Sequence, residues 1–350
     1  MMKRRLLQTL GLALLVSTAA HAQTPAELER GARAEGQLAS VGMPDDWANW
    51  RGTWADLKRA YGLNHVDSDM SSAEEIAKMA AEAANATVDI GDVGFEFGAI
   101  AKSRGITRAY KPSTWAQIPD WARDADGHWA LAYTGTIAFA VNKKHVANVP
   151  RSWKALFDGR YRVLIGEAGR AAQANAGILS AAIALGGDEA HLDPALAQFA
   201  RIAREHRLVT TNATPALMER GEADVFVIWD FNALSYRDKI PNGADYELLI
   251  PSDGSVTSGY TTLINKSAPH PNAAMLAREY IFSDAGQLNL ARGHARPIRI
   301  ASLKLPDDVK KQLIDNSQYK AARALQVALW TEEAKKIPRA WQREVMGAAQ

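Results

Sequence analysis

The side chains that could do chemistry in this chain are carboxylates, aromatic rings and histidines, because its 350 residues include no cysteine. That absence excludes disulfides, thiolate nucleophiles and cysteine-based metal sites. The sequence also has no G-x-S-x-G elbow, H-E-x-x-H helix, P-loop or complete G-x-G-x-x-G motif. Its eight histidines show no metal-ligand spacing. We therefore predict no catalytic residue, no bound metal and no cofactor, in a protein that is not an enzyme.

A pair of adjacent acids could instead indicate an enzyme. Asp45 and Asp46 could share acid–base work. Adjacent acids are also common before a helix start, where the helix dipole favours negative charge. A periplasmic hydrolase or lyase that uses Asp45, Asp46 or Asp230 stays open as the alternative from a different functional class.

Polar and aromatic side chains follow several predicted strands, which indicates a recognition surface. The candidate ligand-binding residues at these strand ends are Asp45, Asp46, Trp47, Asp92, Phe95, Glu96, Trp229, Asp230 and Asn232. Aromatic rings can hold a cation, with a contribution of about 0.5–2 kcal/mol each. Buried unpaired carboxylates are costly, so the set favours a ligand with positive charge or many hydroxyl donors. Arg170, near a predicted helix start, favours instead an anion such as phosphate.

The elements that must position these side chains alternate between strand and helix. Strands are predicted at residues 36–42, 88–90, 136–142, 162–165, 223–228 and 261–265, with a turn at 91–94. Helices are predicted at 47–61, after a capping box at Ser71 and Glu74, and at 171–185, 192–206 and 271–282, with a mostly helical stretch at 306–350. This order is typical of α/β architecture with largely parallel sheets. Ligands then bind beyond the carboxyl ends of the strands.

The first residues are typical of an export signal. A basic start at Lys3, Arg4 and Arg5, an apolar run and the cleavage pattern at 20–22 predict a signal peptide over residues 1–22, cleaved after Ala22. The mature charge is then (41 − 3) − 39 = −1. A nearly neutral chain gives no electrostatic reason to bind nucleic acid or an anionic membrane. We expect a periplasmic protein with no membrane span after cleavage.

Four segments resemble the type II periplasmic solute-binding proteins of ABC importers, in the branch that receives polyamines, thiamine, ferric iron and sugar phosphates. They are GMPDDW at 42–47, YTGTIAFAVNK at 133–143, SGYTTLINKSAPHPNAA at 258–274 and YIFSDAGQ at 280–287. The resemblance implies two Rossmann-like α/β lobes joined by a two-strand hinge, with the ligand between them. Lobe 1 would comprise residues 23–135 and 260–305, and lobe 2 residues 136–259. Residues 306–350 would form helices packed across the lobes.

The resemblance also implies partners and further site residues. A small-molecule ligand would close the hinge, and an inner-membrane permease would receive it from a monomer. Tyr133, Thr134 and Tyr260, at the crossover strands, join the expected ligand-binding residues. The chain departs from the family in lacking the adjacent tyrosines of ferric receptors and the usual hydroxyl residue after Gly166. Arg170 or Gln173 would replace that hydroxyl, and Ser255 and Thr257 could bind an oxyanion.

Three ligand classes therefore remain open for this family. A polyamine- or thiamine-like cation is favoured, a phosphorylated small molecule such as a sugar phosphate comes second, and ferric iron comes last. The sequence does not separate import from presentation of the ligand to a chemoreceptor.

Overall fold

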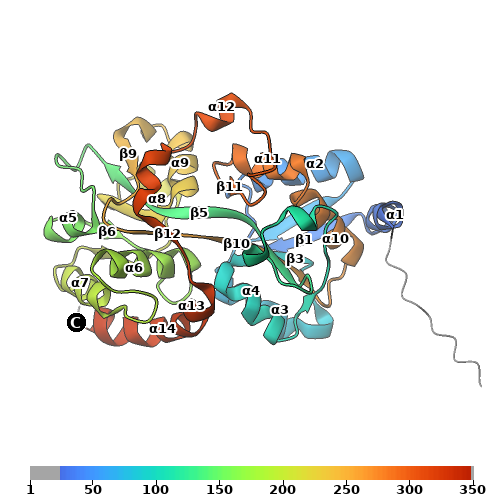
Figure 1. Cartoon of the computed structure of the whole chain (residues 1–350), viewed down its shortest axis with the longest axis horizontal. Helices are drawn as coiled ribbons and strands as arrows, with labels where there is room; N and C mark the ends of the chain where they lie inside the picture. The colour runs from blue at the N-terminus through green and yellow to red at the C-terminus, as the bar shows by residue number, and fades with distance from the viewer. Residues whose placement is uncertain (1–23, 348–350) are drawn as a thin grey trace, which may run out of the picture.

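The computed structural model describes residues 24–347, so the predicted signal peptide lies outside the described residues. The chain forms two α/β lobes joined by two long antiparallel strands, β5 (Trp129–Asn142) and β10 (Ser255–Asn265). Both strands run across the middle of the molecule, with helices on either side of them (Figure 1). β5 pairs with β10 from Trp129 to Thr136 and then with β8 from Ile137 to Val141, so one strand belongs to both sheets.

The first lobe is built on three parallel strands. β1 (Gln37–Val41) pairs with β2 (Asn64–Ser68) on one side and with β3 (Ile90–Gly94) on the other, and β10 extends this sheet in antiparallel direction. The helices on this side are α1 (Pro25–Glu35), α2 (Trp50–Tyr61), α3 (Ser72–Glu82), α4 (Phe95–Ser103), α10 (Pro271–Ile281) and α11 (Asp284–Arg292). Two short strands, β4 (Thr107–Arg108) and β11 (Arg296–Pro297), pair with β10 and β5.

The second lobe repeats this arrangement. β6 (Val163–Leu164) lies parallel to β7 (Leu208–Val209) and to β8 (Val225–Trp229), while β9 (Tyr246–Leu249) pairs antiparallel with β5. The helices are α5 (Trp153–Asp158), α6 (Ala172–Ala184), α7 (Asp193–Arg204), α8 (Pro215–Glu219) and α9 (Asp230–Lys239). Every residue of β8 is buried, as expected for a strand covered on both faces.

The C-terminal segment returns through both lobes. After α12 (Asp307–Lys310), β12 (Ala322–Ala324) pairs with β10. α13 (Val327–Glu333) then packs against α4, whereas residues 341–346, which follow α14 (Ile337–Ala340), pack against α7. The predicted helical stretch therefore also contains a strand, and Pro338, at the start of α14, does not break the helical run from 327 to 346.

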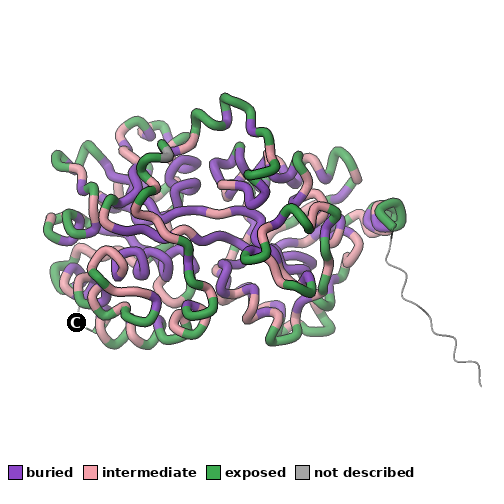
Figure 2. Tube along the Cα trace, viewed as in Figure 1, coloured by how far each residue is buried: buried purple, intermediate pink, exposed green. Residues whose placement is uncertain are grey.

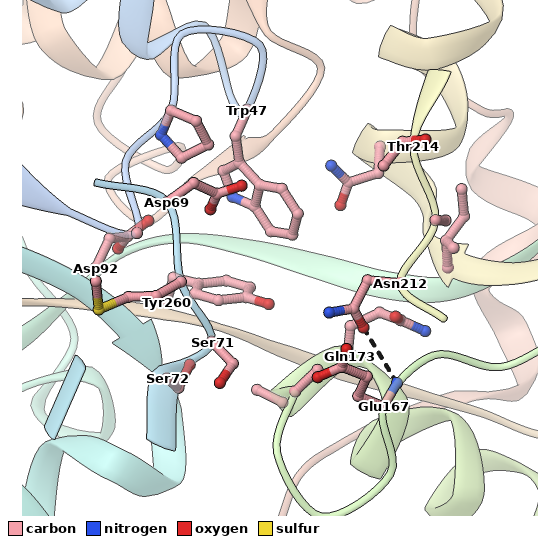
Figure 3. A pocket seen from close by; sticks show the side chains of 18 of the residues that line it. Trp47, Asp69, Ser71, Ser72, Asp92, Glu167, Gln173, Asn212, Thr214 and Tyr260 are labelled. Carbon is pink, nitrogen blue, oxygen red and sulfur yellow. Dashed lines mark hydrogen bonds between the residues drawn. The ribbon is translucent and has the colours of Figure 1, made fainter. Parts of the chain in front are cut away.

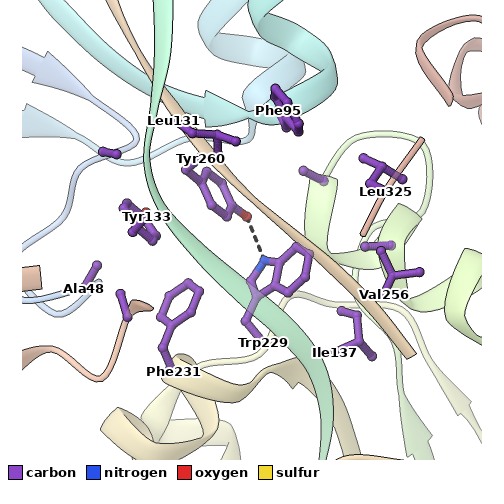
Figure 4. Packing of buried hydrophobic residues seen from close by; sticks show 14 of the residues in the cluster. Ala48, Phe95, Leu131, Tyr133, Ile137, Trp229, Phe231, Val256, Tyr260 and Leu325 are labelled. Carbon is purple, nitrogen blue, oxygen red and sulfur yellow. Dashed lines mark hydrogen bonds between the residues drawn. The ribbon is translucent and has the colours of Figure 1, made fainter. Parts of the chain in front are cut away.

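Buried residues concentrate along the two long strands (Figure 2). At the hinge, Tyr133 stacks on Tyr260 with ring centroids 5.7 Å apart, and Phe231 meets Tyr133 edge-on. The indole Nε1 of Trp229 donates to the Tyr260 hydroxyl at 3.0 Å (Figure 4). Buried aromatic polar atoms usually find such partners. The hinge is therefore a packed aromatic core that both lobes share.

The predicted elements are mostly confirmed, but β3, β5 and β10 are longer than predicted, and β10 begins at Ser255 instead of residue 261. The turn predicted at 91–94 is part of β3, because β3 lies between β1 and β10 and finds hydrogen-bonding partners on both sides. β5 begins at Trp129 instead of residue 136, where β10 supplies the pairing. The capping box at Ser71 and Glu74 is confirmed at the start of α3.

Candidate ligand-binding cleft

A cavity of about 500 Å³ lies between the two lobes, within the usual range for small-molecule sites. Segments from both lobes line it. The lining residues are Gly42, Pro44, Asp46, Trp47, Asp69, Met70, Ser71, Ser72, Glu74, Glu75, Asp92, Glu167, Arg170, Ala171, Ala172, Gln173, Asn212, Ala213, Thr214, Pro215, Ile228, Asn232, Tyr236 and Tyr260.

The carboxyl ends of the parallel strands bring the lining segments together. In the first lobe these are the loop after β1, the residues between β2 and α3, the first turn of α3, and Asp92 in β3. In the second lobe they follow β6, β7 and β8. Parallel strands end at the same edge of a sheet, so residues far apart in sequence meet there. Figure 3 shows Asp69, Asp92, Ser71 and Ser72 facing Gln173, Asn212 and Thr214 across the space.

Seven of the sixteen predicted ligand-binding residues line this cavity. They are Asp46, Trp47, Asp92, Arg170, Gln173, Asn232 and Tyr260. The structure places the other nine outside the lining: Asp45, Phe95, Glu96, Tyr133, Thr134, Trp229, Asp230, Ser255 and Thr257. Several of these have partners of their own that explain their positions.

Asp230 is buried at the start of α9 and holds the hinge together. Its Oδ1 accepts from the backbone N–H of Thr136 at 3.0 Å and of Phe231 at 2.8 Å, and its Oδ2 accepts from the Tyr319 hydroxyl at 2.7 Å. Burial raises the pKa of this carboxyl, and these hydrogen bonds oppose the rise. The position after a buried strand, which suggested ligand contact, here serves a structural junction.

The predicted hydroxyl residues are likewise occupied within the hinge. Ser255 Oγ donates to the carbonyl of Ile137 at 2.7 Å, and the Thr257 hydroxyl lies 2.8 Å from that of Thr136. Thr134 faces Gly259 of β10 in the strand register. Trp229 and Tyr133 belong to the aromatic core beneath the cavity.

The remaining predicted residues belong to the first lobe and lie outside the cavity lining. Phe95 packs edge-on against Trp129 at 5.6 Å. Glu96 is buried at the start of α4, where burial raises its pKa to about 7. Asp45 is half exposed and lies 3.6 Å from Arg51 in an ion pair.

Most of the first-lobe wall was not predicted from the sequence. Asp69, Met70, Ser71, Ser72, Glu74 and Glu75 follow β2, a strand that we did not predict. β2 reads NHVDS and is an edge strand with alternating exposure, so it lacks the apolar run by which a buried strand is recognised. The capping box at Ser71 did mark this helix start, but we assigned it a structural role. Asn212 and Thr214, after the two-residue strand β7, carried no comparable signal.

Charge in the cavity is strongly unbalanced. Among residues 24–347, six carboxyl side chains and one arginine, Arg170, line it. The carboxyls are those of Asp46, Asp69, Glu74, Glu75, Asp92 and Glu167. Arg170 is engaged, because it forms an ion pair with Glu74 across the cleft and lies 3.7 Å from Glu167. A second ion pair joins the lobes where Lys239 Nζ lies 3.0 Å from Asp46 Oδ1.

Two of these carboxyls are buried and shifted in pKa. Burial raises the pKa of Asp92 to about 8, although a hydrogen bond from Tyr133 opposes the rise. Burial and the neighbouring Asp92 raise the pKa of Glu75 well above its usual value. Asp46 and Glu74 behave oppositely, because hydrogen bonds from Lys239 and Ser71 respectively lower their pKa values. The cavity therefore combines ionised carboxylates at its rim with protonatable ones at its floor.

The described part of the chain offers neither a metal centre nor a membrane span. Among residues 24–347 no group of three or more His, Asp or Glu side chains is placed to hold a metal ion. No helix in the same range is long and apolar enough to cross a membrane.

Comparison with known proteins identifies relatives of the fold and the family. The family described as "Bacterial extracellular solute-binding protein" matches residues 85–322. No curated protein matches this sequence significantly.

Three solved structures illustrate the likeness of fold. The periplasmic binding protein AgtB from A. tumefaciens R10, in complex with agropinic acid, has a TM-score of 0.73 at 17% identity, over 89% of this chain and 98% of that chain. AfuA from Actinobacillus pleuropneumoniae, with fructose-6-phosphate bound, has a TM-score of 0.71 at 18% identity, over 88% and 98%. The ferric binding protein from Campylobacter jejuni has a TM-score of 0.66 at 18% identity, over 87% and 98%. At this identity the likeness shows the two-lobed fold and no ligand.

Proposed function

This chain belongs to the bacterial extracellular solute-binding proteins, and we propose that within that family it is the periplasmic receptor of an ABC importer for a small organic cation. Its ligand would be of polyamine or thiamine type and would bind in the cavity between the lobes. Hinge closure around the ligand would present it to an inner-membrane permease. The proposal includes export with cleavage after Ala22, action as a monomer, and lobes bounded near residues 135 and 260.

The observation that carries this proposal is the charge of the cavity. Six carboxyls face the space, and its one arginine is already paired with two of them. An anionic ligand would have to approach these carboxylates without a free positive partner. A cation instead supplies the countercharge that buried carboxylates otherwise lack. Trp47 and Tyr260 add ring faces that can hold a cation.

The residues that favoured a phosphorylated ligand are not available to bind one. The support for such a ligand in the sequence came from Arg170 and from hydroxyls at Ser255 and Thr257. Arg170 is bound to carboxylates, and the two hydroxyls make contacts within the hinge. The hydrolase alternative weakens in the same way, because the Asp230 carboxyl accepts three hydrogen bonds away from the cavity.

A ligand panel tests the proposal directly. Solute extracted from the purified protein would be identified by mass spectrometry, and polyamines, thiamine, sugar phosphates and ferric citrate would be compared in thermal unfolding. We expect the cations alone to raise the unfolding temperature, with about 2.7 kcal/mol of stabilisation at a hundredfold excess over Kd. A shift with sugar phosphates and none with amines would contradict the cation proposal. Turnover of a bound solute would contradict the receptor role.

A further inference from the structure

Two buried carboxyls at the floor of the cavity lack partners for part of their hydrogen-bonding capacity. Glu75 in α3 and Asp92 in β3 are each 1% exposed, yet both line the cavity. Within the described residues, Glu75 Oε2 and Asp92 Oδ1 accept no hydrogen bond of good geometry. The nearest donors are the backbone N–H of Asp92 for Glu75 and the indole Nε1 of Trp50, itself without a partner, for Asp92, and each lowers the pKa of its carboxyl against the effect of burial. A buried polar atom without a partner costs about 1–3 kcal/mol, so each one calls for an explanation.

Neighbouring residues of the first lobe and of the hinge hold both carboxyls in place. Glu75 lies between Gly42 and Gly91, where a Cβ on Gly42 would collide with its Oε1 and one on Gly91 would lie 2.9 Å from its Oε2. Asp92 Oδ2 accepts from the Tyr133 hydroxyl at 2.6 Å, and that hydroxyl accepts from Trp47 Nε1 at 2.6 Å. The aromatic wall of the cavity is thus tied to its acidic floor.

The charged groups that act most strongly on this pair are also acids. Glu75 is influenced by Asp92, Asp67 and Asp69, and Asp92 by Asp67. The other ionisable groups that face them are phenols, Tyr133 against Asp92 and Tyr260 near both carboxyls. A floor built this way retains protons when it is empty, because burial disfavours the ionised carboxyls and the neighbouring acids add to that effect.

The opposite wall has a different chemistry. The second lobe faces the space with the amides of Gln173, Asn212 and Asn232 and the hydroxyl of Thr214. Of the described second-lobe residues that line the cavity, Glu167 and Arg170 alone are charged, and their charges oppose each other. The first lobe contributes five of the six carboxyls. The cavity is therefore polarised, acidic on one side and neutral but hydrogen-bonding on the other.

We propose that Glu75 and Asp92 form the subsite for a protonated amine, and that the rest of the ligand offers hydroxyl or amide groups to the second-lobe wall. This inference rests on the proposed function, since it assigns one end of the ligand to one lobe. The amine donates N–H bonds to Glu75 Oε2 and Asp92 Oδ1. A proton held by the pair leaves to solvent as the ammonium enters, so binding exchanges one positive charge for another.

Calorimetry tests this exchange without altering the protein. Amino alcohols and amino sugars, each paired with its hydroxyl analogue, would be titrated at pH 7 in buffers of different ionisation enthalpy. We expect amines to bind more tightly than their hydroxyl analogues, with net proton release to the buffer. Amine binding with no linked proton release would overturn the exchange. An analogue that binds as tightly as its amine would overturn the subsite.

Isosteric variants test the residues. Glu75→Gln and Asp92→Asn should each weaken amine binding about tenfold to a hundredfold and reduce proton release, while binding of hydroxyl analogues changes little. Asp45→Asn, an acid nearby but outside the cavity, should bind as wild type does. Circular dichroism would show that each variant folds, and either variant alone suffices for the test.

The two proposals fail in different ways. Unchanged amine affinity in either floor variant, when that variant is folded, would overturn the subsite and leave the receptor function standing. If no solute of any class binds the wild-type protein, the receptor function fails and the subsite with it.

Discussion

At the scale of single residues, the floor of the cleft shows how position changes the chemistry of one side-chain type. Asp92, buried in β3, has its pKa raised to about 8 by burial, whereas hydrogen bonding by Lys239 lowers the pKa of Asp46 at the rim. Both acids line one cavity. Burial disfavours the charged form of a carboxyl, while a cationic partner favours it. The same residue type can therefore hold a proton at the floor and a charge at the rim.

This difference predicts how stability depends on pH. Between the ordinary Asp pKa of 3.8 and the raised value of about 8, folded Asp92 binds more protons than the unfolded chain does. The free energy of unfolding should therefore fall as pH rises through that window. Asp92→Asn should flatten the decline. Urea unfolding at pH 5 and pH 8 measures the decline in both proteins, and equal slopes in wild type and Asp92→Asn would contradict the assignment.

At the scale of elements, the site depends on how closely β1, β3 and α3 approach. Gly42 follows β1 with φ of +68°, a conformation that favours glycine, and its missing side chain leaves room for the Glu75 carboxyl. The capping box at Ser71 fixes the start of α3 and hence the position of Glu75 one turn later. The glycine after β1 and the capping box of α3 thus together determine where the buried Glu75 carboxyl lies.

The close approach predicts a measurable cost for one methyl group. Gly42→Ala should destabilise the protein more than Gly62→Ala, by about 1–3 kcal/mol. Gly62 also has a positive φ, +77°, but an added Cβ there meets nothing within 4 Å, so it controls for backbone strain alone. Thermal and chemical unfolding compare the two variants. Equal losses would show that Glu75 does not occupy the space beside Gly42.

At the scale of the whole molecule, the lobes meet across the cleft through exposed ion pairs. Arg170 reaches Glu74 and Lys239 reaches Asp46, in both cases from the second lobe to the first. Exposed ion pairs contribute only about 0–1 kcal/mol each and weaken with salt. Contributions of that size still shift an equilibrium between open and closed lobes by several-fold.

The ion pairs therefore predict a change of shape with little change of stability. The double variant Arg170→Met/Lys239→Met should populate more open molecules, seen as a larger radius of gyration in small-angle scattering, and high salt should do the same to wild type. Lys154→Met removes an exposed ion pair to Asp158 within α5 and should leave the shape unchanged. Identical scattering from the double variant and wild type would show that these pairs do not hold the lobes together.

The parts of this site that could be predicted are those with a pattern within a single short segment of the sequence. The strand–helix order, the capping box at Ser71 and the polar ends of the strands after Val41 and Leu164 follow from periodicity and turn chemistry. Glu75 and Asn212 could not be identified in this way, because one lies on a helix that reads as amphipathic and the other follows a two-residue strand.

The sequence by itself determined the fold class, the family resemblance and the acidic, aromatic character of the strand ends. Only the tertiary structure decided which acids line the cavity, because burial and partners depend on contacts between distant segments. Asp230 follows the buried strand β8 and Asp92 lies within the buried strand β3, yet one holds the hinge and the other lines the cavity. The strand that carries a residue sets the position of its backbone. The segments that pack against it from elsewhere in the fold decide which groups its side chain contacts.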